Sequence, residues 1–192
     1  MKNVIKYLLV IFTALSTQAA VAQNASTTNE VDTDRKNYSK HGIGAVLSSS
    51  NGKGLAYRYW PKNFGVQVSF VPYASNSEQY YNGGITFYQR LKSYSVGDLF
   101  LHAGVEYQYQ QNERYYYDTY FSSYYQSYEV MSNGVNIGFG PGYHFALKSV
   151  SFDCFFGYGA YIRDESSTFV GADLNDRRIM TVSGGIAVFL NL

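Results

Sequence analysis

The clearest pattern in the chain is an alternation of large apolar and small or polar residues from Val135 to Ile162. Before Lys148 the odd positions are apolar or aromatic, apart from one proline, and glycine recurs at the even positions; after Ser149 the even positions are apolar. A period of two is typical of β-strands. Each arm is close to the roughly 9–11 residues of a tilted membrane-spanning strand. The stretch therefore predicts a β-hairpin, with a local bulge expected at Pro141, which lacks the N–H that a ladder needs.

The glycine-rich face of this hairpin indicates which side of the strands is inside. A face in contact with water normally carries Lys and Glu, whereas glycine within a strand marks a place too crowded for a side chain. The axis of a narrow barrel is such a place. We therefore expect the glycine face inside and Phe139, Phe156 and Val188 outside, against lipid. The alternative is a soluble, lipocalin-like ligand-binding barrel with the apolar face inside.

Alternation elsewhere in the chain predicts eight strands in total. They are expected at residues 41–48, 54–60, 64–73, 80–92, 98–110, 135–147, 150–162 and 177–192. The connections 49–53, 74–79, 111–132 and 164–176 are expected to be long, and those between them tight. Short turns on one side and longer loops on the other are typical of membrane barrels. The predicted fold class is all-β, an eight-stranded antiparallel transmembrane up-and-down β-barrel.

The start of the chain predicts secretion. Lys2 and Lys6 border an apolar core, and Ala20-Val21-Ala22 fits a cleavage site, so residues 1–22 are predicted to be a signal peptide. Residues 23–40 are expected to form a flexible periplasmic leader, and residues 41–192 the barrel. An even number of strands then places both barrel ends and the tight turns in the periplasm. A net charge of +1 gives no support for a nucleic-acid partner.

The closing strand adds a resemblance. Residues 183–190 read Ser-Gly-Gly-Ile-Ala-Val-Phe-Leu and resemble the polar-x-Gly-x-x-apolar-x-apolar signal that the barrel-assembly machinery reads. With the strand pattern, residues 42–192 are similar to small, porin-like outer-membrane β-barrels of the OmpA/OmpX type. This resemblance implies the cell outer membrane as location, with outer-membrane lipid and the assembly machinery as partners. The chain departs from the family by ending in Asn191-Leu192, where members end in an aromatic residue.

Several ionisable residues are predicted to point into the barrel. Buried charges persist only when they are paired, so we expect an interior polar network in which the two acids pair with an arginine. Its predicted members are Arg58, Arg90, His102, Glu106, His144 and Asp153. Such a network would plug the lumen, which in eight strands is just wide enough for side chains.

Chemical alternatives for these residues are a shared metal at His102 and His144, a narrow pore, and an outer-membrane lipid-modifying enzyme, an acyl hydrolase or transferase. Such an enzyme needs a histidine near the outer leaflet, but His41, His102 and His144 all map to the periplasmic end. The sequence contains no G-x-S-x-G, H-E-x-x-H or P-loop pattern. We therefore expect no catalytic site, no metal and no cofactor.

A tyrosine-rich segment from Tyr115 to Tyr128 is the candidate surface-binding region. Tyrosine and serine together are typical of recognition loops; alternatively, these tyrosines extend the neighbouring strands and form an interfacial girdle. The candidate binding residues are Tyr115, Tyr116, Tyr117, Tyr120, Tyr124, Tyr125 and Tyr128. The expected function is an envelope-structural or surface-interaction role, with an extracellular protein or glycan as partner.

Overall fold

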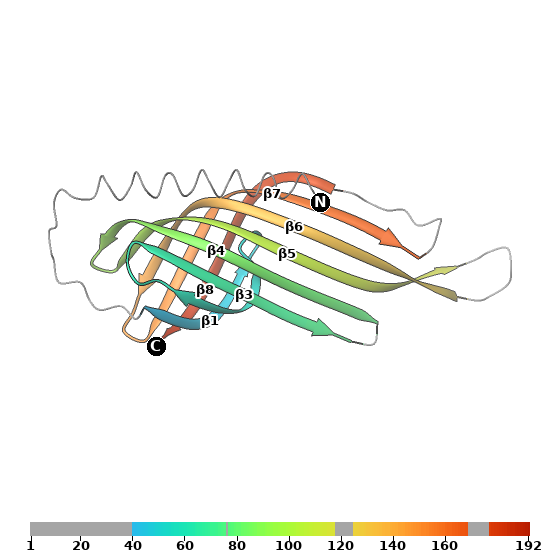
Figure 1. Cartoon of the computed structure of the whole chain (residues 1–192), viewed down its shortest axis with the longest axis horizontal. Helices are drawn as coiled ribbons and strands as arrows, with labels where there is room; N and C mark the ends of the chain where they lie inside the picture. The colour runs from blue at the N-terminus through green and yellow to red at the C-terminus, as the bar shows by residue number, and fades with distance from the viewer. Residues whose placement is uncertain (1–39, 76, 118–124, 169–176) are drawn as a thin grey trace. The chain divides into compact units, whose positions relative to one another are not determined.

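A computed structural model of the chain describes residues 40–75, 77–117, 125–168 and 177–192. The predicted signal peptide and nearly all of the predicted leader lie outside the described residues. The strands are β1 (His41–Ser48), β2 (Lys53–Tyr59), β3 (Phe64–Ala74), β4 (Glu78–Tyr94), β5 (Gly97–Tyr117), β6 (Tyr125–Ala146), β7 (Val150–Ser167) and β8 (Arg177–Asn191). Each pairs antiparallel with the next in the chain, and β1 also pairs with β8. The predicted fold class, a closed eight-stranded antiparallel barrel, is confirmed (Figure 1).

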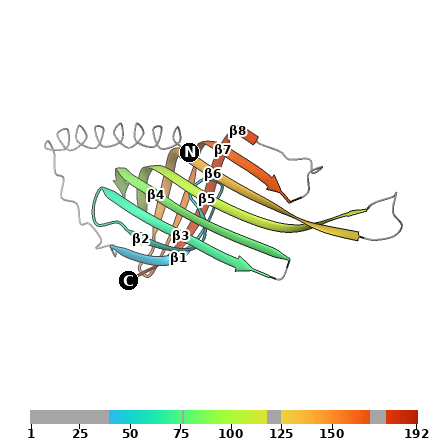
Figure 2. The same ribbon diagram turned by 45° about the vertical axis from the view of Figure 1, so that its right-hand side comes forward.

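The strands differ from the prediction mainly in length. β1 has the predicted bounds, whereas β5 and β6 have 21 and 22 residues and pair as far as Tyr117↔Tyr125. Figure 2 shows this pair reaching beyond the other strands. The prediction ended both strands where the apolar alternation ends. Backbone pairing needs no apolar side chain, so the ladder continues through polar and tyrosine-rich sequence.

The faces of the strands are as predicted. Phe139, Phe156 and Val188 point outward and are 62%, 65% and 39% exposed, while Gly138 and Gly140 are buried. In the described part of the chain, sixteen polar or charged residues are buried, against nine hydrophobic ones. The barrel therefore has an apolar outer wall and a largely polar interior, the reverse of a soluble protein.

The predicted alternation of long and tight connections is wrong for the first half of the chain. The connection between β3 and β4 spans only residues 75–77, because Ala74 and Gln79 are already paired. The connection between β1 and β2, residues 49–52, is no longer than that between β2 and β3, residues 60–63. No helix among the described residues is long and apolar enough to cross a membrane.

Pro141 does not produce the predicted bulge. Pairing between β6 and β7 passes from Phe139↔Tyr158 to Gly142↔Phe155, so two pairs are missing but the register is unchanged. The proline N–H is absent on the side that faces β7, and the ladder is simply interrupted there. The register shift in the barrel instead lies between Arg90 and Lys92 on β4.

Candidate functional site

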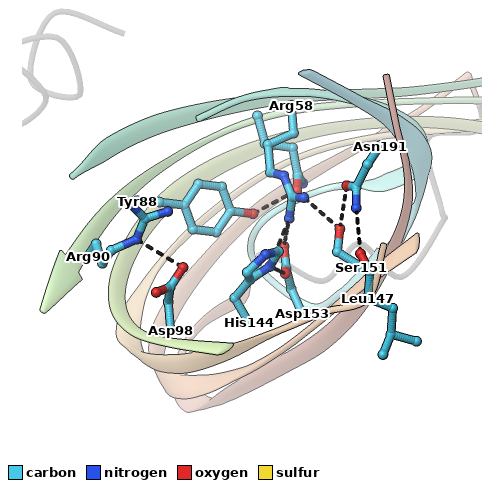
Figure 3. Close-up of polar contacts among 10 residues, drawn as sticks. Arg58, Tyr88, Arg90, Asp98, His144, Leu147, Ser151, Asp153 and Asn191 are labelled. Carbon is cyan, nitrogen blue, oxygen red and sulfur yellow. Dashed lines mark hydrogen bonds and ion pairs between the residues drawn. The ribbon is translucent and has the colours of Figure 1, made fainter. Parts of the chain in front are cut away.

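The candidate site is a buried ionic cluster inside the barrel, near the end that carries the β4–β5 and β6–β7 turns. Arg58 on β2 reaches across the lumen, and its Nη1 lies 2.6 Å from Oδ2 of Asp153 on β7. His144 on β6 places Nδ1 2.5 Å from the other carboxylate oxygen of Asp153. Arg58 and Asp153 are only 4% and 0% exposed. The ion pair expected between Asp153 and an arginine is therefore present (Figure 3).

Neutral polar groups continue this cluster toward the barrel end. Arg58 donates from Nη2 to the Ser151 hydroxyl at 2.7 Å, and Ser151 donates to Oδ1 of Asn191 at 3.1 Å. Asn191 in turn donates to the backbone carbonyl of Leu147 at 3.3 Å. The chain of contacts in Figure 3 thus joins β2, β7, β8 and the β6–β7 turn. Both carboxylate oxygens and two guanidinium nitrogens are engaged, which is what a buried pair needs in order to persist.

A second ion pair lies in the same half of the barrel. Nε of Arg90 on β4 is 3.0 Å from Oδ2 of Asp98 on β5, and Asp98 is buried. The sequence reasoning placed Arg90 inside but did not include Asp98, because this residue was assigned to the beginning of its strand. The alternation that places Phe100 and His102 inside gives Asp98 the same orientation, and this signal could have identified it.

Trp60 separates the two arginines and fills the lumen between them. It belongs to the β2–β3 connection, is 6% exposed, and stacks on Tyr88 with ring centroids 5.2 Å apart. The guanidinium carbons of Arg58 and Arg90 lie 5.6 and 5.0 Å from the Trp60 ring centre, within reach of a cation–π interaction. A side chain at Gly65 would approach Trp60 Cγ to 2.7 Å, which explains the glycine.

Glu106 corrects the predicted network. It is fully buried, but its carboxylate accepts hydrogen bonds from the side-chain amides of Asn82 on β4 and Asn136 on β6. The predicted pairing with Arg58 or Arg90 is wrong. Arg58 and Arg90 lie near the end of the interior that carries the β4–β5 turn. Glu106 lies at another depth, because successive inward residues of β5 occupy different depths. Glu106 is therefore a separate polar site in the half of the barrel toward which β5 and β6 extend.

His102 is also separate from the ionic cluster. Its ring packs between Phe100 and Phe155, with centroids 6.4 and 5.1 Å away. In the β5–β6 register His102 faces Gly140, whereas His144 faces Asp98, four positions further along. Four positions along a strand span about 13 Å, so the predicted equal depth of the two histidines is wrong, and with it the shared metal. Among the described residues no three His, Cys, Asp or Glu side chains form a group that could hold a metal ion.

The β1–β2 connection fills the other half of the lumen, and sequence reasoning missed this. Ser50 and Asn51 are 2% and 0% exposed because the connection folds into the barrel. Its backbone carbonyl at Asn51 accepts hydrogen bonds from the hydroxyls of Ser69 and Thr86. The Ser50 hydroxyl also contacts that of Ser183. The segment Ser50–Gly52, termed here the inserted turn, therefore blocks the barrel from inside.

Glycines on neighbouring strands make room for the inserted turn. A Cβ at Gly104 would collide with the Asn51 side chain, and one at Gly138 with Ser50. A Cβ at Gly84 would lie 2.8 Å from the Cα of Gly52, which itself has a φ of 91°. The sequence pattern attributes the glycine-rich face to a crowded axis. The crowding is real: the inserted turn crowds Gly84, Gly104 and Gly138, whereas the Phe100 ring crowds Gly142.

The tyrosine-rich segment is partly strand. Residues as far as Tyr117 belong to β5 and those from Tyr125 belong to β6, so the predicted extension of both strands occurs. Tyr115 is 64% exposed and Tyr128 is half-buried. Tyr116, Tyr117 and Tyr125 lie in the paired backbone. The remaining candidates, Tyr120 and Tyr124, lie outside the described residues.

Fold and interior together define the class: a closed antiparallel barrel of eight strands with an apolar outer wall and a lumen filled by polar side chains. No family model matches the chain, and no curated protein matches it. Among solved structures, it is similar to the crystal structure of a major outer membrane protein from Thermus thermophilus. That similarity has a TM-score of 0.39 and 14% sequence identity, and covers 78% of this chain and 99% of the other.

Proposed function

We propose that this protein is a non-enzymatic outer-membrane β-barrel with an envelope-structural or surface-interaction role. The observation that carries the proposal is the inverted distribution of side chains. Apolar residues such as Leu55 and Phe156 are 75% and 65% exposed on the outer wall, whereas charged residues such as Arg58 and Asp153 are buried inside. In water such a wall would be unstable, whereas in a bilayer it is the favourable arrangement.

Aromatic residues support the same location. Tyr59, Phe64, Phe145 and Phe152 are exposed at the end of the barrel that carries the β2–β3 and β6–β7 connections. Girdles of aromatic side chains at the edges of the apolar band are typical of transmembrane barrels. A soluble lipocalin-like barrel would require its apolar side chains to point inward and its polar side chains outward. It would also have a ligand cavity in place of the filled lumen.

The filled interior favours a structural role over catalysis. His144 and Asp153 are bound to each other and to Arg58 in a buried cluster. The alternative proposal, a lipid-modifying outer-membrane enzyme, would require these groups to reach a lipid ester. Outer-membrane lipid and the barrel-assembly machinery remain the proposed partners common to both roles.

The extended β5–β6 pair supports a surface-interaction role. Pairing of β5 with β4 ends at Glu78↔Asn112, and pairing of β6 with β7 ends at Val130↔Ser167. Beyond these pairs, the described strands continue as a two-stranded ribbon from Arg114↔Tyr128 to Tyr117↔Tyr125. The edges of such a ribbon can accept another strand, and exposed tyrosines such as Tyr115 can contact an extracellular protein or stack on a sugar.

Membrane fractionation combined with gel mobility tests the proposal. Cells producing the protein are separated into inner membrane, outer membrane and soluble fractions, and each is run with and without boiling. We expect the protein in the outer-membrane fraction, with a mobility that changes on boiling because the closed barrel resists detergent when unheated. Recovery in the soluble fraction, with a single mobility, would contradict the proposal and favour the soluble ligand-binding barrel.

A further inference from the structure

The β1–β2 hairpin is much shorter than the strands on either side of it. Pairing of β1 with β8 ends at Ser48↔Gly185, yet β8 continues to pair with β7 as far as Arg177, eight residues further on. Pairing of β2 with β3 ends at Leu55↔Phe70, yet β3 continues to pair with β4 for four more residues, to Ala74. The wall of the barrel is therefore shorter at this hairpin than at the strands on either side of it.

The apolar face of β8 continues past the end of the hairpin. Val182 and Met180, the outward residues beyond Gly184, are 75% and 86% exposed. Met180 is more exposed than any other large hydrophobic residue described. The end of the hairpin consequently lies beside outward apolar residues of β8 rather than above them. In the bilayer location proposed above, lipid would surround this point.

A groove of about 470 Å³ lies at this low point of the wall. Leu47 and Ile186 give it an apolar side; Ser49 and Lys53 give it polar groups, and Gly184 and Gly185 add no side chain. Among the described residues that line the groove there is no carboxylate. A lysine on the lipid face of a barrel is destabilising, more so toward the middle of the bilayer than near its interfaces. An anionic group close to its ammonium would reduce this destabilisation.

We propose that this groove binds one membrane lipid with an anionic phosphate headgroup, its acyl chain on Leu47 and Ile186 and its phosphate at Lys53. Leu47 and Ile186 are cross-strand neighbours that offer an apolar contact to a hydrocarbon chain, and the lysine gives the groove a charge opposite to that of the phosphate. The Ser49 hydroxyl, at the same edge, is engaged with the backbone of Gly184, so Lys53 supplies the polar contact to the headgroup. This inference depends on the proposed bilayer location and adds a specific lipid site to it.

Native mass spectrometry on the refolded full chain tests the site. The protein is released from mixed micelles or nanodiscs that contain phosphatidylglycerol and phosphatidylcholine with identical acyl chains, and retained lipid is counted. We expect the protein to retain about five times more phosphatidylglycerol than phosphatidylcholine, because this is the ratio expected for one lysine near a phosphate. Lys53→Met and Lys53→Glu should abolish it. Lys148→Glu, the same charge change in the exposed β6–β7 turn, is the matched control and should leave it unchanged.

A second measurement places the lipid in the groove. Ile186→Trp introduces a fluorophore at the apolar side, while the native Trp60 is buried in the lumen and out of reach of lipid. Brominated phosphatidylglycerol should quench the new tryptophan more than brominated phosphatidylcholine does, and Lys53→Met should remove the difference.

Four results would overturn the inference. The first three are equal retention of both lipids by the parent, a preference that survives in Lys53→Met, and a preference that Lys148→Glu also removes. The fourth is a dimer that excludes lipid from the groove, because the occupant would then be a second copy of the chain. A parent that partitions into membranes and is heat-modifiable but shows no lipid preference would leave the proposed function intact. A parent that fails those two tests would refute the proposed function itself.

Discussion

At the scale of single residues, the interior is held by contacts that depend on charge and cannot be replaced one partner at a time. Arg58 contacts Asp153, Ser151 and His144, and its guanidinium also lies 4.2 Å from the ring centre of Phe189. Removing one partner of a buried pair leaves the other charge without compensation. Glu106, held by two amides, is in a different situation, because its partners are neutral.

Asp153→Asn should destabilise the barrel by about 3–5 kcal/mol, because it leaves the Arg58 charge buried without a counter-ion. The double variant Arg58→Met with Asp153→Asn should cost much less than the sum of the single changes. Denaturant unfolding of the refolded barrel in lipid vesicles or detergent measures the free energies. Glu106→Gln is the matched control, and should cost less than Asp153→Asn because an amide can still bond to Asn82 and Asn136. Additive losses for Arg58 and Asp153 would show that the pair does not couple.

Phe139→Arg and Phe156→Arg should each lower the free energy of unfolding in lipid by roughly 2–4 kcal/mol, because they place a charge in the apolar band. Both side chains are outward and more than 60% exposed in the middle of their strands. Phe152→Arg is the control: it is outward near the end of β7, where an arginine should cost only about 0–1 kcal/mol. Equal stability of all three variants in bilayers would contradict the membrane assignment.

At the scale of elements, the inserted turn and the glycines of four strands depend on each other. β4, β5, β6 and β8 leave out side chains where the inserted turn and the neighbouring Ser48 approach them. The inserted turn thus fills the lumen at the depth where the inward residues of the neighbouring strands are glycines and too few large side chains point inward.

Gly104→Ala should destabilise the barrel by about 1–3 kcal/mol, because the new methyl overlaps the Asn51 side chain. Adding Asn51→Gly should restore part of this loss by removing the overlapping atoms while keeping the backbone carbonyl that binds Ser69 and Thr86. Gly83→Ala is the control, since its added Cβ would have no neighbour closer than 3.9 Å. Denaturant unfolding measures the free energy of unfolding of the parent and of each variant. If Asn51→Gly brings no rescue, the glycine is not there to accommodate the turn.

At the scale of the whole molecule, the barrel and the β5–β6 ribbon are separable in energetic terms. Every strand of the barrel pairs on both sides, whereas the ribbon from Arg114↔Tyr128 to Tyr117↔Tyr125 has only its own two described strands. Isolated two-stranded ribbons are marginally stable. The ribbon therefore contributes little to the stability of the barrel, and its exposed tyrosines are available for contact.

Replacing Tyr115–Tyr128 by an Asn-Gly turn should leave the barrel folded and heat-modifiable, because the pairing of β5 with β4 and of β6 with β7 lies outside the replaced segment. Any binding of the parent to an extracellular protein or glycan, measured on intact cells, should be lost. An epitope inserted within residues 118–123 should be reached by antibody on whole cells, whereas one inserted at Lys148 in the β6–β7 turn should not. A replacement that prevents folding would show that the segment belongs to the barrel wall.

The sequence by itself determined the number of strands, their pairing order and the face that each presents. These features follow from a local period of two, and a narrow lumen leaves one orientation for a glycine-rich face. Only the tertiary structure decided which inward residues meet. Arg58 and Asp153 are 95 residues apart and are joined across the lumen by the strand registers, whereas Glu106 is carried to another depth. The inserted turn was equally hidden, because a Ser-Asn-Gly sequence suits an exposed turn as well as a buried one. Its burial depends on glycines of distant strands, which become its neighbours only when the barrel closes.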